Sequence, residues 1–517
     1  MPRNAIGREI PKEVDGRVLK PFKGAYVDLK PGHFAPMVMR PAKWGTSKLL
    51  PSIDDAFAKT GLKDGACLSF HHHLRNGDGV LNMVMAVAER RGLKGLKLAQ
   101  SAIFPVHEPV CRLIENGTIT SIEGSTNGPV GRIITEGKMK GTAIMRSHGA
   151  RSRAIQMGDV KIDGAFVAAP VADAYGNANG RSGPAACGPL GYALADSMFA
   201  ENVVVVTDNL QPYMVTPPII SQACVDYVVK VDSIGDPKAI SSGTTEVATD
   251  EQSLKIARGA ADLVDALGLV RDGIGFQAGA GGASLAAIGL LGELMKKRGV
   301  KARFAHGGIT KDMIRMQKEG LIDWIIDTQS FDMESAQSLL TNPKHAEINP
   351  DIYANPFNRG QLVNMLDFGF LGATEIDIDF NVNVNTHSDG YLLHGIGGHQ
   401  DVAAGAKHCI IVCPTRRKNW PIVMERVTNV TTPGECIDAI VTEEGIAINP
   451  ARDDMLEKAR AANLPVKDIQ ELAKIALQKA GGVKPGEPEY FDRVVGVIEW
   501  RDGTVIDVVR QLKRKGG

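Results

Sequence analysis

Three consecutive histidines stand in the segment SFHHHLRNGDG, residues 69–79, and raise the question of which chemistry they serve. Imidazole ligates metals, transfers protons and hydrogen-bonds anions. Consecutive residues at a strand end point to opposite faces, and no HExxH or paired CxxC completes a zinc site, so we expect no metal. One interpretation is that these histidines only satisfy hydrogen bonds in the core or at the surface. The other is recognition of a carboxylate by His72 and its neighbours with Arg75, whose planar guanidinium matches that group.

A glycine-rich segment, GIGFQAGAGGAS at residues 273–284, supplies a second set of groups suited to anions. It lacks the spacing of the dinucleotide fingerprint, and no Walker A lysine follows it. Backbone N–H groups at the start of a following helix would instead cradle a phosphate, a carboxylate or a developing oxyanion. A tight turn that needs positive φ is the structural alternative.

The elements that must position both segments follow from the alternation of short β-branched runs with helical patterns, which predicts the α/β class. Both segments read strand, glycine loop, helix, basic turn, strand. Phe70 to Ala99 and Phe276 to Ala305 are each 29 residues apart. We therefore predict two similar open α/β domains, with both segments beyond the carboxyl ends of strands, where such sheets bind ligands.

Composition and length set further limits. The 517 residues carry 59 basic and 59 acidic side chains, which gives no support for nucleic acid or a polybasic membrane contact. Seven scattered cysteines, an N-terminus without a signal-type core and the lack of a long apolar run favour a cytoplasmic enzyme with reduced thiols. We divide the chain into an extended N-terminal arm at 1–51, a first domain at 52–250 and a second domain at 251–517, joined near residues 241–255.

Several loop motifs occur in one order from about residue 52 to the C-terminus: SFHHHLRNGDG, SHGARSR, PVADAYGNANG, GFQAGAGGASLA, FAHGGITKDM, DTQSFD, FNVNVNTHSDG and GIGGHQDVAAGA. With this set the chain resembles the alpha subunits of citrate lyase, within the CoA-transferase superfamily. The resemblance implies the two-domain CoA-transferase fold and an acyl transfer in which citrate replaces acetate on a thioester of an acyl carrier protein or CoA. It also implies that the prosthetic group is CoA-like and sits on a carrier (gamma) subunit, with no cofactor attached to this chain, and that a separate lyase (beta) subunit completes a multisubunit complex.

The same motifs identify the candidate site residues. We expect the thioester or CoA to contact Gly279, Gly281, Gly282, Ala283, Ser284, Gly397 and Gly398. We expect the acid to contact His71, His72, His73, Arg75, Ser147, His148 and His399.

The nucleophile departs from the superfamily pattern. Many CoA-transferases carry a glutamate that attacks the thioester, and here Gly307 and Gly308 fill the corresponding loop. Glu115 matches part of a glutamate motif found in another branch of the CoA-transferases. Its context, however, predicts the end of a helix followed by an Asn-Gly cap. Glu375 is the better remaining acid for a catalytic or orienting role. Without a nucleophile, we expect a ternary complex in which the acid attacks the thioester directly.

Three alternatives stay open at this point. The chain could be a citramalate-type lyase alpha subunit, or an acyl-CoA hydrolase on the same fold in which water replaces the acid. It could also only dock the carrier protein, although that reading leaves the paired glycine loops unexplained.

Overall fold

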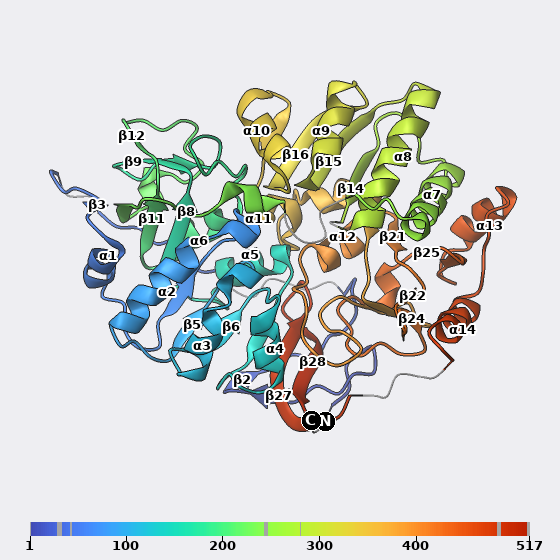
Figure 1. Ribbon diagram of the computed structural model, residues 1–517, viewed down its shortest axis with the longest axis horizontal. Helices are drawn as coiled ribbons and strands as arrows, with labels where there is room; N and C mark the ends of the chain where they lie inside the picture. The colour runs from blue at the N-terminus through green and yellow to red at the C-terminus, as the bar shows by residue number, and fades with distance from the viewer. Residues whose placement is uncertain are drawn as a thin grey trace.

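Two open β-sheets, each flanked by helices, form the computed structural model of this chain (Figure 1). The structure describes residues 2–27, 34–41, 44–241, 247–279, 281–482 and 488–513. Ten strands hydrogen-bond in the first sheet and eight in the second. The predicted class, two similar open α/β domains, is confirmed by this architecture.

The first sheet has a parallel centre. Its central strands are β4 (Cys67–Ser69), β5 (Leu96–Leu98), β6 (Ile119–Glu123), β7 (Ala143–Met145), β8 (Gly164–Ala169), β11 (Val203–Thr207) and β13 (Tyr227–Lys230), and β3 (Leu49–Leu50) lies at one edge. They are ordered β7-β6-β5-β4-β8-β11-β13-β3. The helices of this half are α1 (Ile53–Thr60), α2 (Val80–Arg90), α3 (Val110–Glu115), α4 (Pro129–Thr135), α5 (His148–Gln156) and α6 (Tyr192–Phe199).

The second sheet repeats this plan. Its strands are β14 (Gly275–Ala278), β15 (Ala302–Ile309), β16 (Ile322–Ser330), β17 (His345–Glu347), β18 (Phe368–Leu371), β21 (Cys409–Val412), β25 (Ala439–Thr442) and the antiparallel β26 (Gly445–Ile448). They are ordered β17-β16-β15-β14-β18-β21-β25-β26. The helices are α7 (Glu251–Ala266), α8 (Gly282–Arg298), α9 (Lys311–Lys318), α10 (Met333–Thr341), α11 (Pro350–Ala354), α12 (His399–Gly405), α13 (Asp453–Ala461) and α14 (Ile469–Lys479).

The two sheets share one topology. When the central strands are counted along the chain, both sheets run in the order 4-3-2-1-5-6-7, with parallel pairs throughout. The order reverses between β4 and β8 in the first sheet and between β14 and β18 in the second. The crevice beyond such a reversal is where open α/β sheets bind ligands. The histidine segment follows β4 and the glycine segment follows β14, so both occupy equivalent switch points.

The predicted internal echo accounts for this match. The units β4–α2–β5 and β14–α8–β15 each place a helix between two neighbouring parallel strands. In α2 the side chains of Val80, Val84 and Val87 are buried, as their helical spacing predicts. Helix α8 is more uniformly apolar and buries residues on several faces, among them Leu285, Ile288, Leu291 and Met295.

Segments near both chain ends complete the first sheet. Strands β27 (Tyr490–Glu499) and β28 (Val505–Leu512) form a hairpin, and β27 pairs in parallel with β7 (Figure 1). The predicted limit of the second domain, 251–517, therefore includes a hairpin that belongs to the first sheet. The cause is a strand pairing between segments far apart in the chain, and local periodicity does not encode it.

The N-terminal arm is held against this hairpin. Asn4 Nδ2 donates to the carbonyl oxygen of Ile506 at 2.7 Å, and the ring of Phe22 lies 5.5 Å from the ring of Trp500. Short strands β1 (Glu13–Val14) and β2 (Arg17–Val18) form a turn within the arm, and β3 joins the sheet. In its described residues the arm is therefore packed against the fold. The joint expected near 241–255 lies partly outside the described residues, and α7 begins at Glu251.

Shorter strands outside the two main sheets form small sheets of their own. They are β9 (Val171–Asp173), β10 (Ala178–Asn179), β12 (Leu210–Gln211), β19 (Glu375–Asp377), β20 (Val382–Asn383), β22 (Arg416–Arg417), β23 (Trp420–Pro421) and β24 (Val423–Met424). Among the residues that the structure describes, no helix has the length and apolar character needed to cross a membrane.

Candidate active site

Candidate residues of the first half contact segments of the second half beyond the carboxyl ends of the strands. Gln329, at the end of β16, reaches the main chain of His72 beyond β4. Gly397, before α12, accepts a hydrogen bond from the backbone N–H of His148. Both contacts join the second half of the chain to the first, so the site lies between the two sheets.

His72 is fixed by hydrogen bonds from both halves. Gln329 Nε2 donates to the backbone oxygen of His72 at 2.9 Å, which leaves Gln329 Oε1 to accept from His72 Nε2 at 3.1 Å. His72 Nδ1 lies 2.6 Å from Ser101 Oγ and therefore accepts a hydrogen bond from the Ser101 hydroxyl. Because both ring nitrogens hold protein partners, His72 supports the site and presents its ring face, not a free nitrogen.

His71 and His73 flank this ring and are buried. Their rings stack at 5.6 Å, and no described residue hydrogen-bonds any of their four ring nitrogens. His71 Nδ1 lies 3.9 Å from an oxygen of Asp196, a carboxylate already paired with Arg151. Burial lowers the pKa of His71 to about 4 and lowers the pKa of His73 well below its usual value. Both rings are therefore neutral hydrogen-bonding groups at physiological pH.

His148 is the half-buried histidine of the group. It is the first residue of α5, directly after the N-cap Ser147, and its ring stacks on His72 at 5.6 Å. The ring of Tyr192 lies 4.8 Å from His148 and 4.6 Å from His72. Although an edge of His148 reaches solvent, its surroundings desolvate it enough to lower its pKa to about 3. His148 can therefore offer a neutral N–H to an anion in the crevice.

Arg75 supplies the cation of the first half. Its backbone adopts a left-handed conformation, φ 51°, and its guanidinium lies over two rings, 5.3 Å from the centroid of Phe104 and 4.8 Å from that of Phe331. Burial lowers the pKa of Arg75 to about 10, so the group stays charged at neutral pH. Phe331 follows β16, so this cation also sits between the two halves.

The GGHQD segment, residues 397–401, contributes to the site through its backbone more than through His399. The ring of His399 is saturated, with Nε2 donating to the oxygen of Gly372 at 2.9 Å and Nδ1 lying 2.8 Å from Thr432 Oγ1. Gly398 is required sterically, because a Cβ there would lie 2.4 Å from the hydroxyl of Tyr353. His399 is thus buried within the second half, while Gly397 contacts His148.

The glycine segment ends at the start of α8. Gly281 is the N-cap with φ −76°, and Gly282, Ala283 and Ser284 form the first turn. The N–H groups of a first helical turn have no intrahelical partner, so they can receive an anionic ligand. The hydroxyl of Ser284 is buried and lacks a partner among the described residues. Gly279 N–H is used within the fold and donates to the oxygen of Phe370 at 2.7 Å.

Gly307 and Gly308 lie within β15, at a bulge in its pairing with β16, and not in the loop that the sequence analysis expected. Both positions are glycine for a steric reason. A Cβ on Gly307, which has φ +100°, would lie 2.6 Å from the amide of Gln277. A Cβ on Gly308 would lie 2.1 Å from the ring of Phe331. Where the superfamily pattern places a glutamate, these two side chains occupy the space instead. This part of β15 has neither a carboxylate nor room for one without repacking.

Glu375 is fully buried in β19 and is saturated with donors. Its oxygens accept from Asn383 Nδ2 at 2.8 Å, from the N–H and hydroxyl of Thr428 at 2.8 and 3.0 Å, and from the hydroxyl of Ser388. Four donors leave this carboxylate without a free direction toward the crevice. The geometry favours a structural role for Glu375.

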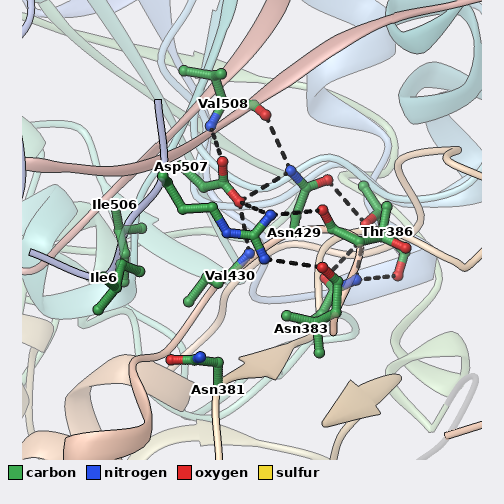
Figure 2. Close-up of polar contacts among 12 residues, drawn as sticks. Ile6, Asn381, Asn383, Thr386, Asn429, Val430, Ile506, Asp507 and Val508 are labelled. Atoms are coloured by element: carbon green, nitrogen blue, oxygen red, sulfur yellow. Dashed lines mark hydrogen bonds and ion pairs between the residues drawn. The ribbon is translucent and has the colours of Figure 1, made fainter. Parts of the chain in front are cut away.

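The network around that carboxylate continues to the C-terminal hairpin (Figure 2). Thr386 receives a hydrogen bond from Asn383 and donates to Asn429 at 3.1 Å, and Asn429 donates to the oxygen of Val508 at 3.0 Å. Asp507 then accepts from the N–H of Val430 at 2.8 Å.

Glu115, the other acid considered, is exposed at the end of α3 and is followed by the cap Asn116, as its sequence context predicts.

Several residues around the crevice were not among the predicted ones. Tyr192 packs on two histidines, Gln329 clamps His72, and Tyr353 Oη accepts from Gln277 Nε2 at 3.0 Å. Asp401 accepts from Ser147 Oγ at 2.8 Å. Gln329 and Asp401 stand inside the motifs DTQSFD and GGHQD. A polar residue at the carboxyl end of a strand, or in the first turn of a helix after a glycine pair, was the signal that could have identified them.

The charges of these residues favour an anionic ligand held by neutral donors and one guanidinium. No group of three histidine, cysteine, aspartate or glutamate side chains among the described residues has a metal-binding arrangement. Desolvation keeps His71, His72, His73 and His148 neutral, so Arg75 is the cation among the candidate residues of the first half. Backbone N–H groups at α8 serve the same purpose in the second half.

Comparisons with known proteins agree with this geometry. The family model described as "Citrate lyase, alpha subunit (CitF)" matches residues 46–512. The citrate lyase alpha chains of Klebsiella pneumoniae and Escherichia coli (strain K12) are each 43% identical over 467 residues, covering 90% of this chain and 92% and 91% of theirs. A crystal structure of a citrate lyase alpha subunit from Streptococcus mutans in complex with citrate has a TM-score of 0.95 and 44% identity, covering 99% of this chain and all of that one.

Proposed function

Because the chain belongs to the family of citrate lyase alpha subunits, we propose that it is the citrate:acetyl-carrier transferase component of citrate lyase. It exchanges acetate for citrate on a thioester of an acyl carrier protein, giving citryl thioester and free acetate. The observation that carries this proposal is the placement of the histidine and glycine segments at equivalent switch points of two facing sheets with one topology. That arrangement holds two anionic reactants against each other.

The first half binds the acid. Arg75 offers a planar cation, and His148, whose pKa the charge of Arg75 helps to lower, offers a neutral N–H. The buried, unpartnered polar atoms of His71 and His73 lie deeper along the same edge. A polyanion such as citrate compensates these groups, because a buried donor without a partner costs about 1–3 kcal/mol.

The second half binds the thioester of the carrier. The first turn of α8, with Gly281, Gly282, Ala283 and Ser284, donates to the phosphates or the thioester oxygen. The CoA-like prosthetic group belongs to a separate carrier (gamma) subunit, and a separate lyase (beta) subunit consumes the product. All seven cysteines of this chain are free thiols, which fits the reducing cytoplasm.

The reaction proceeds through a ternary complex. A citrate carboxylate attacks the acetyl thioester carbonyl, and the tetrahedral oxyanion collapses with loss of the carrier thiolate to give a mixed anhydride. The thiolate then attacks the citryl carbonyl of that anhydride and expels acetate, so no atom of the protein is acylated. Positioning supplies roughly 7–11 kcal/mol of barrier lowering, and a donor aimed at the oxyanion roughly 3–4 kcal/mol more.

Acid-dependent release of acetate tests this function. Purified chain is mixed with labelled acetyl-coenzyme A or acetylated carrier, with and without citrate, citramalate and related hydroxy acids. Acetate release that requires citrate, with matching citryl thioester, supports the proposal. Release that is independent of any acid identifies a hydrolase, a preference for citramalate identifies the citramalate-type subunit, and no release from either donor leaves only carrier docking.

A further inference from the structure

The peptide segment that carries His148 is held from the second half of the chain by three hydrogen bonds. His148 N–H donates to the oxygen of Gly397 at 3.0 Å. On one side of it Ser147 Oγ donates to Asp401 Oδ1 at 2.8 Å, and on the other side Gly149 N–H donates to Asp401 Oδ2 at 3.0 Å. One short segment of the second half, residues 397–401, therefore fixes the backbone on both sides of His148.

Asp401 is suited to this task by burial and charge. The carboxylate is fully buried, and its Oδ1 also accepts from Arg501 Nε at 3.1 Å, so three donors converge on it. Because the three donors point at both oxygens of the side chain, each oxygen must accept a hydrogen bond. A carboxylate meets this requirement, whereas a carboxamide has one oxygen. Arg501 comes from the turn of the C-terminal hairpin and also donates to the oxygen of Ala354 at 2.9 Å. The first turn of α5 is thus anchored to a rigid, multiply bonded group.

We propose that Asp401 is a positioning residue that orients His148 toward a carboxylate of the acceptor acid, so that the second domain sets the acid-binding geometry of the first. The inference rests on the proposed function for the identity of the acid. It assigns to GGHQD a role in shaping the acid site, through Gly397 and Asp401, beside any contact with the thioester. The ring of His148 is then placed by this anchored backbone together with its stacking on His72 and its edge contact with Tyr192.

Asp401→Asn tests the proposal, because an amide presents one acceptor and one donor to the three converging donors. We expect the KM for citrate and the citrate dissociation constant, measured by calorimetry without thioester, to rise about tenfold to 100-fold, the factor of one hydrogen bond to a charged group. The KM for acetyl-coenzyme A should change less than about twofold. Ser147→Ala, which removes one of the three donors at lower structural cost, should raise the citrate constants by a smaller factor.

Asp367→Asn is the matched control. Asp367 also bridges a backbone N–H and an arginine, accepting from Gly275 N at 2.8 Å and from Arg271 at 2.7 Å, but it lies at the amino edge of the second sheet. Its substitution should leave both KM values unchanged, whatever it does to the thermal unfolding midpoint. This comparison separates the general loss of a carboxylate that bridges a backbone N–H and an arginine from the loss of orientation at His148.

A double-mutant cycle with His148→Ala tests whether Asp401 affects citrate binding through His148. If Asp401 acts through His148, then Asp401→Asn adds little to the citrate constants once the ring is gone. Equal factors in both backgrounds would overturn the proposal, as would unchanged citrate constants in folded Asp401→Asn and Ser147→Ala. Failure of the proposed function would look different, because the wild-type chain itself would then show no citrate-dependent acetate release.

Discussion

Replacing Gly281 with valine separates a ligand-binding loop from an ordinary turn. Gly281 is the N-cap of α8 with φ −76°, a conformation open to any residue. Among the described residues beyond its chain neighbours, a Cβ built there meets only the hydroxyl of Ser284, at 3.8 Å. The fold therefore accepts the side chain, and the cost is the weaker capping preference of valine, about 1 kcal/mol. For a domain of this size that lowers the unfolding midpoint by roughly 2–4 °C.

The cost to function should be much larger. A ligand must approach the backbone closely to accept from the N–H groups of the first turn. The valine methyl groups would occupy that space and block the approach. Loss of donors aimed at a developing oxyanion lowers kcat about 100- to 1,000-fold. The assay is acetate release from acetyl-coenzyme A at saturating citrate, with calorimetric melting of the same sample.

Gly289→Ala, in the middle of the same helix, is the control. Its Cβ meets nothing within 4 Å, so we expect normal turnover and a gain of about 0.5–1 kcal/mol in stability. Normal turnover by Gly281→Val would refute the reasoning, since the loop would then be only a turn. A collapse of the melting transition in that variant would refute the steric part.

Three further predictions follow from the same geometry. Arg75→Ala should raise the KM for citrate roughly tenfold or more and leave that for the carrier thioester nearly unchanged, and equal effects on both would remove this guanidinium from the acid pocket. Acetyl thioester alone should leave no covalent adduct on the chain in intact-mass spectra after borohydride or hydroxylamine, and the steady-state kinetics should be sequential. Parallel double-reciprocal lines, or a label on Glu375 or Glu115, would overturn the ternary route. Because burial lowers the pKa of His71 to about 4 and of His148 to about 3, the unfolded chain binds more protons between about pH 6.5 and pH 4, and the free energy of unfolding should fall as pH falls through that window. Melting at pH 7, 6 and 5 in constant salt checks this sign, and a midpoint that rises toward pH 5 would contradict it.

The sequence predicts those features that are encoded locally. The unit of strand, glycine loop, helix and strand repeats within about 30 residues in each half, and its apolar spacing at Val80, Val84 and Val87 reports a buried helix face directly. Given two such units, the switch-point rule places the histidine and glycine segments at the carboxyl edges. This is why the architecture and the location of both segments followed from periodicity alone.

Contacts between distant segments escape that reasoning. Gln329 and His72 are 257 residues apart, and Asp401 and Gly149 are 252 residues apart. No periodicity records which distant residue will face a given side chain. For the same reason the sequence does not reveal that Gln329 and Ser101 occupy both ring nitrogens of His72, or that four donors surround Glu375.

The pairing of β7 with β27 has a consequence for the order in which the chain is made. The ribosome delivers β7 before all strands of the second sheet and β27 after them, and domains generally begin to fold from the N-terminus as they emerge. During most of translation the first sheet therefore has an open edge at β7, and unpaired edges invite association with other chains. The second sheet can form while the first is still incomplete. This topology therefore requires that the edge of β7 is protected until β27 pairs with it. A chaperone or the N-terminal arm could provide that protection.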